Sequence, residues 1–175
     1  IYNWGYNSAY GGEGGFYNLV ANYYKYGPAT KRKNRIVEPL DASGKWYIAD
    51  NFVFGFPAIT RDNWAGGVQG DYRQDCRSDS MHGFAPVKTQ TAEEAFELVL
   101  SGAGAVLPVR DRLDLRIIEE VRNGTATFGN GIIDSQDEVG GWPDMQTYNI
   151  PMDSDEDGMP DGWEQSHSGC GLDPL

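Results

Sequence analysis

The sequence predicts an all-β fold in which the chain forms rungs of a parallel β-helix, covered by two α-helices and followed by an irregular acidic tail. Three observations lead to this prediction. Short aromatic and β-branched runs, bounded by Gly and Pro, fill the first third of the chain. Two of these runs resemble each other at a spacing of 29 residues. Helical spacing of apolar residues follows between residues 91 and 124.

The composition is that of a folded, acidic protein with many turns. Of the 175 residues, 23 are Gly and 9 are Pro, and the 39% of hydrophobic residues are enough for a core. The formal net charge of −12 argues against a general nucleic-acid binder. No apolar run approaches the roughly 18 residues of a membrane span. Because the chain begins at Ile1 without a Met or a signal-peptide pattern, we expect a piece of a processed or truncated protein.

Residues 1–60 are predicted to form the rungs. Aligning Asn22 with Asn51 pairs three further positions: Tyr17 with Trp46, Leu19 with Ile48, and Tyr23 with Phe52. The two Asn amides are expected to stack at equivalent turns and to satisfy backbone groups at a buried corner. Residues 1–5 are interpreted as the end of a preceding copy. The alternative is a pair of unrelated hairpin strands.

Residues 61–147 are predicted to form a loop, up to about residue 90, and then two helices that pack on the rungs. Thr91 and Glu94 form a capping box, and Gly102 closes the first helix. Asp111 is expected to cap a second helix that runs to about Arg122. The expected apolar faces are Ala95, Phe96, Val99 and Leu100 for the first helix, and Leu113, Ile117 and Val121 for the second, with Leu115 and Ile118 beside them.

Charged residues are divided unevenly along the chain. Residues 1–36 hold five basic side chains and one acidic one, whereas residues 134–175 hold eleven carboxylates and no Lys or Arg. Four of the basic residues form one stretch, the basic segment: Lys31, Arg32, Lys33 and Arg35. The basic segment is the candidate site for a polyanionic substrate. The alternative is a solvated basic loop.

Residues 148–175 are predicted to be a calcium-binding tail. The predicted ligands are the side chains of Asp153, Asp155, Asp157, Asp161 and Glu164 and the backbone carbonyl of Met159. With Gly158 at the sixth place, this spacing matches the twelve-residue calcium loop. Because Pro151 opposes an entering helix, the loop resembles the calcium repeats of thrombospondin type 3 and dockerin modules, which are extracellular. We therefore expect a structural clip with an affinity on the order of 10⁻⁴ M. The alternative is a solvated acidic tail.

The two cysteines, Cys76 and Cys170, leave two possibilities open. A disulfide between them would close a long loop and stabilise the fold by about 4 to 5 kcal/mol in the chain-entropy model. Two unpaired thiols are the other possibility.

Two stretches of the sequence carry a family resemblance. Ile1-Tyr-Asn-Trp-Gly-Tyr-Asn-Ser-Ala-Tyr-Gly-Gly-Glu13, followed by Asn18-Leu-Val-Ala-Asn-Tyr-Tyr-Lys-Tyr-Gly-Pro-Ala-Thr30, resembles the later rungs of pectate lyases of polysaccharide lyase family 1. Gly131-Ile-Ile-Asp-Ser-Gln-Asp-Glu-Val-Gly-Gly-Trp-Pro143 and the calcium tail resemble the C-terminal ends of secreted members of that family.

The resemblance implies a right-handed β-helix and calcium-dependent β-elimination on pectate (polygalacturonate), outside the cell. The family's catalytic arginines lie in an Arg-x-Pro-x-x-Arg stretch upstream of the position of Ile1, and no Arg-x-Pro occurs in this sequence. The catalytic residues of this chain are therefore unknown. We expect a catalytically incomplete C-terminal portion that needs the missing N-terminal part of the same enzyme as its partner.

Two other functions stay open at this point. One is a non-catalytic, calcium-stabilised carbohydrate-binding or cell-surface module on the same fold. The other is a glycoside hydrolase, which needs two carboxylates across the scissile bond. Asp75 and Asp79 are the candidates for that pair, and nothing in the sequence positions them.

Overall fold

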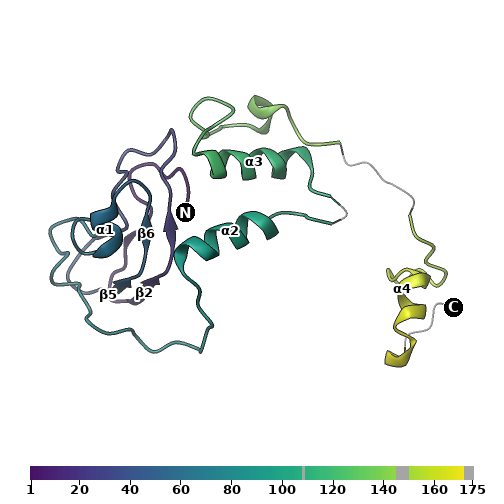
Figure 1. Cartoon of the computed structure of the whole chain (residues 1–175), viewed down its shortest axis with the longest axis horizontal. Helices are drawn as coiled ribbons and strands as arrows, with labels where there is room; N and C mark the ends of the chain where they lie inside the picture. Colours follow the sequence, from purple (N-terminus) through teal and green to yellow (C-terminus); the bar gives the residue numbers. More distant parts are fainter. Residues whose placement is uncertain (108, 145–149, 172–175) are drawn as a thin grey trace. The chain divides into compact units, whose positions relative to one another are not determined.

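The computed structural model describes residues 1–107, 109–144 and 150–171. The chain divides into two compact units, Ile1–Trp142 and Pro143–Leu175. The first unit is β-rich, with short parallel strands followed by helices (Figure 1). Across the described ranges, no helix has the length and apolar character needed to cross a lipid bilayer.

The strands of the first unit pair in parallel in three small sheets. The pairs are β1 (Tyr10–Gly11) with β4 (Glu38–Pro39), β2 (Phe16–Val20) with β5 (Lys45–Ala49), and β3 (Tyr23–Tyr24) with β6 (Phe52–Val53). In the last two pairs each residue lies opposite the residue 29 positions further on. The alignment of Tyr17 with Trp46 and its companions is therefore confirmed, and the hairpin alternative is wrong.

Parallel pairing extends beyond these strands at both ends. Tyr2 bridges Lys25, so residues 1–5 lie beside the next copy as expected. Val68 bridges Val37, and Arg77 bridges Trp46. Residues 68–77 were expected to form only a loop. Their pairing was missed because it consists of single bridges, without an alternating run of apolar residues.

The core lies between the sheets. Along β5, Trp46 and Ile48 are buried, whereas Lys45, Tyr47 and Ala49 are half-buried on the other face, as the two-residue period of a strand requires. The ring of Tyr17 stacks on that of Trp46, with 4.2 Å between centroids. The buried cluster consists of Trp4, Tyr24, Ile36, Val37, Trp46, Ile48, Val53, Ile59, Val68 and Cys76. The members of this core come from positions spread between Trp4 and Cys76.

A stack of three Asn side chains orders one corner, and we call it the Asn stack. The Nδ2 of Asn22 donates to Oδ1 of Asn51 (3.0 Å), and the Nδ2 of Asn51 donates to Oδ1 of Asn63 (2.9 Å). Asn51 is fully buried and also donates to the carbonyl of Leu19 (2.7 Å). The stacking of Asn22 on Asn51 is confirmed. Asn63 was not expected, because it follows Asn51 after 12 residues rather than 29.

Three α-helices complete the first unit: α1 (Pro57–Arg61), α2 (Ala92–Gly102) and α3 (Arg112–Asn123). The capping box of α2 is confirmed, since Glu94 and Thr91 exchange hydrogen bonds. Asp111 caps α3 as predicted, and Gly124 ends it with a φ of 72°. A short 3₁₀ turn, η1 (Gln136–Val139), follows.

The helices cover the strands with only part of their apolar faces. Phe96 of α2 stacks on Tyr23 of β3 at 4.2 Å, and Lys25 donates to the carbonyl of Arg122 at the end of α3. Val99 is 62% exposed, and Ile117 is exposed while its neighbour Ile118 is buried. The predicted inward faces are thus wrong at Val99 and Ile117. The packed stripe is rotated by about one residue, which helical spacing alone does not fix.

The second unit contains α4 (Asp161–Ser166) and the 3₁₀ turn η2 (Ser168–Cys170). The predicted boundary between residues 147 and 148 falls outside the described residues, as do residues 172–175 of the predicted tail. Cys76 is a buried free thiol and Cys170 an exposed one. Burial raises the pKa of the Cys76 thiol.

Candidate functional site

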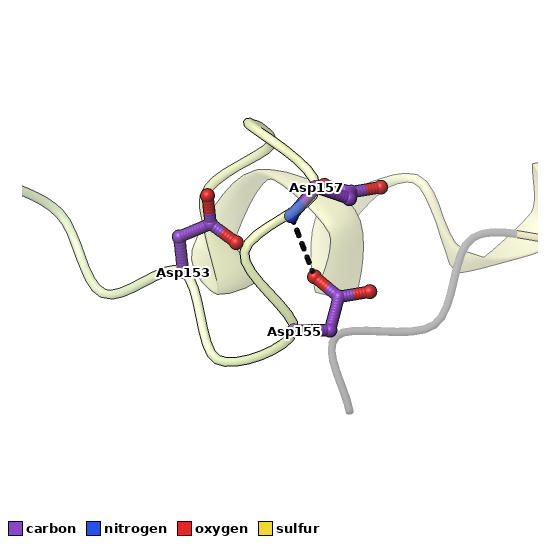
Figure 2. A group of neighbouring side chains, drawn as sticks. All are labelled: Asp153, Asp155 and Asp157. Carbon is purple, nitrogen blue, oxygen red and sulfur yellow. Dashed lines mark hydrogen bonds between the residues drawn. The ribbon is translucent and has the colours of Figure 1, made fainter.

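The predicted calcium loop forms a cluster of carboxylates in the second unit. One carboxylate oxygen each from Asp153, Asp155 and Asp157 lies within 4.8 Å of the others. Figure 2 shows the three side chains around one turn of the loop, immediately before α4. The alternation of the three aspartates along a turning backbone brings them together.

Hydrogen bonds from the backbone hold this loop in shape. Gly158 has a φ of 92°, and its N–H donates to Oδ2 of Asp153 (3.0 Å). The N–H of Met159 donates to Oδ1 of Asp157 (2.8 Å), and the N–H of Asp157 donates to Oδ1 of Asp155 (Figure 2). A side chain at residue 158 would be strained at this φ, which explains the Gly at this place.

Glu164 is the buried member of the set. Its side chain projects from α4, and the residue is only 1% exposed. Burial raises the pKa of its carboxyl, and the nearby carboxylates of Asp157, Asp155, Asp161 and Asp153 raise it further. The Oε2 of Glu164 and the Oδ1 of Asp153 are buried without a hydrogen-bond partner among the described residues. Buried carboxylate oxygens without donors are costly unless a cation or a proton compensates them.

Asp161 has a different surrounding from the other predicted ligands. Its Oδ1 accepts from the N–H of Ser154 and its Oδ2 from the hydroxyl of Ser154, both at 2.7 Å. The N–H of Asp161 donates to the carbonyl of Met152 (2.8 Å). Asp161 therefore ties the start of the loop to the start of α4, while Met159 lies half-buried beside Gly158.

The donor set fits a hard divalent cation. Carboxylate and carbonyl oxygens are the ligands that Ca²⁺ prefers, and it takes six to eight of them. The structure gathers three carboxylates, those of Asp153, Asp155 and Asp157, and the orphaned oxygen of Glu164 is a candidate fourth contributor from α4. A cation at this place would also offset the mutual repulsion that raises the pKa of Glu164.

Three residues of the basic segment lie on the surface of the first unit. Lys31, Arg32 and Lys33 are exposed. The backbone holds the segment, since the N–H of Lys31 donates to the carbonyl of Gly5 (2.9 Å) and the indole N–H of Trp4 donates to the carbonyl of Arg32 (3.0 Å). The segment therefore presents three cations from an anchored loop.

Arg35 is placed differently. It is buried, and its guanidinium donates to Oε1 of Gln69 (2.9 Å), to Oδ1 of Asn7 and to Oε2 of Glu38. These contacts link the segment around Arg35 to Asn7 and to Gln69, which come from two other passes of the chain. Arg35 thus belongs to the internal framework, and the exposed cations of the segment are the other three.

The carboxylates considered for a hydrolase, Asp75 and Asp79, belong to the first unit. Asp79 is exposed and pairs with Arg77, with 3.1 Å between Oδ1 and Nε. Asp75 is also exposed, and its backbone carbonyl accepts from Lys45. Arg77 and the nearby Trp64 line a cleft against β5, and neither was predicted to be a site residue. Segments far apart in the chain form that cleft, so no local pattern marks it.

Comparison with known proteins adds an independent observation. No family model matches the chain. The chain is 28% identical to "Probable pectate lyase C" of Aspergillus terreus (strain NIH 2624 / FGSC A1156), over 99% of the chain and 41% of the relative. It is also 28% identical to the protein of the same name from Emericella nidulans, over 99% of the chain and 40% of the relative. The chain thus spans about two fifths of the length of the curated relatives it matches.

Proposed function

We propose that the chain is the C-terminal portion of a secreted polysaccharide lyase of family 1, which cleaves polygalacturonate by calcium-dependent β-elimination. The observation that carries the proposal is the similarity to two probable pectate lyases along 99% of the chain. The parallel register, the Asn stack and the acidic loop support it, because they occur on the residues that carry the resemblance or next to them.

The fold proposed for residues 1–80 is a right-handed parallel β-helix. In support, partners in all three sheets lie 28 or 29 residues apart, which is the length of one turn of such a coil. The Asn stack repeats at one corner of successive turns. Right-handed crossover is the general rule for parallel strands joined in one sheet.

Calcium is the proposed cofactor of the tail. Asp153, Asp155, Asp157 and Glu164 would hold it with their carboxylates, and Met159 with its carbonyl. Asp161 would bind the cation directly or through a water. Two buried, unpartnered carboxylate oxygens support a cation here over a solvated tail.

The proposed substrate contact is the exposed part of the basic segment. Polygalacturonate carries one carboxylate on each sugar unit, so Lys31, Arg32 and Lys33 provide complementary charge. β-Elimination removes the C5 proton, expels the C4 oxygen of the glycosidic bond and leaves a C4–C5 double bond. Because the sequence holds no Arg-x-Pro-x-x-Arg, we place the proton-abstracting Arg in the missing N-terminal part of the enzyme.

The test is a binding and turnover experiment with polygalacturonate in calcium-containing buffer. We expect the chain to bind the polymer and to produce no absorbance of unsaturated uronide. Combined Lys31→Ser, Arg32→Ser and Lys33→Ser substitution is expected to weaken binding about tenfold at low salt, since each exposed charge contributes up to about 1 kcal/mol. Lys88→Ser, at another exposed Lys, is the control and should leave binding unchanged.

Each outcome bears on a separate part of the proposal. Turnover by the chain alone would contradict catalytic incompleteness, and shorter products without a double bond would contradict a lyase. Absence of binding at low salt would contradict the substrate. A non-catalytic carbohydrate-binding module is the alternative, and it would gain support if the coding sequence upstream of Ile1 lacks the arginine stretch.

A further inference from the structure

A cleft of about 270 Å³ lies against β5, and none of the basic segment lines it. Residues 47–50, 60–64 and 77–79 form its walls, and we call it the β5 cleft. These residues come from the end of β5, from α1 and the turn after it, and from the segment that bridges Trp46. Polar and aromatic side chains from three separate passes of the chain therefore meet at one place.

Two aromatic rings, half-buried, line the β5 cleft. Tyr47 lies on the face of β5 that is turned away from the core. The indole N–H of Trp64 donates to the carbonyl of Ile48 (3.2 Å), and the backbone N–H of Trp64 donates to Oδ1 of Asp62 (3.0 Å). Both bonds fix the orientation of the Trp64 ring. The cleft thus offers apolar ring surface that is already ordered before a ligand arrives.

Guanidinium groups supply hydrogen-bond donors at the same place. The Cζ of Arg77 lies 5.0 Å from the centroid of the Trp64 ring, and its Nε donates to Asp79. The terminal N–H groups of Arg77 have no acceptor among the described residues, and neither has the exposed side chain of Arg61. Each guanidinium carries five N–H donors, so most of these donors remain available to a ligand.

The charge of the β5 cleft differs from that of the basic segment. Arg61 and Arg77 are opposed by three aspartates, Asp50, Asp62 and Asp79. The cleft therefore has no positive excess and offers no net electrostatic attraction to a free carboxylate. It combines donors, acceptors and aromatic surface, and these suit a ligand with hydroxyl groups and an apolar face.

We infer that the β5 cleft binds one uncharged sugar unit, through its ring face and hydroxyl groups rather than through a carboxylate. A pyranose ring presents C–H groups on one face and hydroxyls that both donate and accept. Its C–H face would lie on Tyr47, since the guanidinium of Arg77 already lies over the Trp64 ring. Its oxygens would accept from Arg61 and Arg77. The inference takes from the proposed function only the expectation that the ligand is part of a galacturonan. The site itself is separate from Lys31, Arg32 and Lys33. In a partly esterified polymer, the cleft would select esterified units while the basic segment selects free acids.

The experiment is a titration of the chain with two probes, trigalacturonate and its fully methyl-esterified form. We expect the ester to bind with an affinity that stays constant from about 50 to about 300 mM NaCl, since no net charge is neutralised. Combined Arg61→Ala and Arg77→Ala substitution should weaken ester binding about tenfold through lost hydrogen bonds. Arg73→Ala is the matched control, because Arg73 is exposed on the same segment but lies outside the cleft.

The results separate this inference from the proposed function. If the ester does not bind, or if the double variant binds it as well as the control does, the inference is overturned. Binding of the free acid alone, lost at the higher salt concentration, would also overturn it. The triple variant of the basic segment should leave ester binding unchanged and reduce only polygalacturonate binding. If only the substrate proposal fails, the triple variant will bind polygalacturonate as well as the unchanged chain does. Its binding of the ester will still be unchanged.

Discussion

At the scale of single residues, buried carboxamide and carboxylate side chains organise the Asn stack and the acidic loop. Asn51 satisfies backbone carbonyls on two turns, and Glu164 brings a carboxylate into the buried side of the acidic loop. Both side chains are buried, but they differ in their partners. The side chain of Asn51 forms its hydrogen bonds within the protein, whereas Oε2 of Glu164 has no hydrogen-bond partner among the described residues.

Asn51→Ala tests the internal case. We expect a loss of about 3 kcal/mol in the free energy of unfolding, because the carbonyl of Leu19 and the N–H of Asn22 lose a buried partner. Urea denaturation followed by tryptophan fluorescence measures it. Asn34→Ala, at a half-buried Asn without a hydrogen bond among the described contacts, should change stability by less than about 0.5 kcal/mol. Equal effects of the two substitutions would contradict the role given to the Asn stack.

The sequence predicted that Asn22 stacks on Asn51 but not that Asn63 extends the stack. Asn22 and Asn51 could be matched because aromatic residues repeat around them at the same spacing. Asn63 lacks such neighbours, since α1 shortens the path to the next corner. Arg35 was grouped with exposed cations because a run of charges does not reveal that Gln69 and Glu38 surround one of them.

At the scale of elements, the helix ends were predicted more accurately than the helix faces. N-terminal capping depends on residues three positions apart, so Thr91 and Asp111 could be assigned from local sequence. Gly102 was expected to close α2, but it is the last helical residue, and Ala103 caps the helix in an extended conformation. The buried stripe depends on what lies opposite, and α2 and α3 meet the strands through few side chains. Strand register could be predicted where the sequence repeats every 29 residues. It could not be predicted for residues 68–77, which pair through single bridges.

Thr91→Ala tests the capping box of α2. The substitution removes the acceptor for the N–H of Glu94 and should cost about 1 kcal/mol of local helix stability. Hydrogen exchange at the Glu94 and Ala95 amides is then expected to speed up about fivefold, while amides of β5 keep their rates. Thr91→Ser retains the hydroxyl and should restore slow exchange. A uniform increase across the first unit would contradict a local cap.

At the scale of the whole molecule, the chain consists of two units with different sources of stability. Residues 1–142 bury an aromatic and aliphatic core, whereas the described part of residues 143–175 contains one short α-helix and a carboxylate cluster. A segment of that size has too little apolar burial to hold its shape unaided. We therefore expect calcium to stabilise the second unit and to leave the first unchanged.

Removal of calcium by a chelator tests this division. Amide exchange is expected to rise in residues 150–171 and to stay constant in residues 1–107. Glu164→Gln should lower calcium affinity at least about tenfold in calorimetric titration, since it removes a charged, bidentate ligand. Glu156→Gln, an exposed acid at an unused place in the loop, is the control. Equal loss of protection in both units, or no response to the chelator, would contradict the expectation.

The Asn stack also has a direction. Asn63 ends it by donating both N–H groups to the carbonyls of Asn51 and Ile59, whereas Oδ1 of Asn22 accepts from no group in the described ranges. One side of the column is sealed and the other keeps a vacant acceptor. A further Asn side chain could therefore add to the Asn stack only beside Asn22, where Oδ1 is vacant.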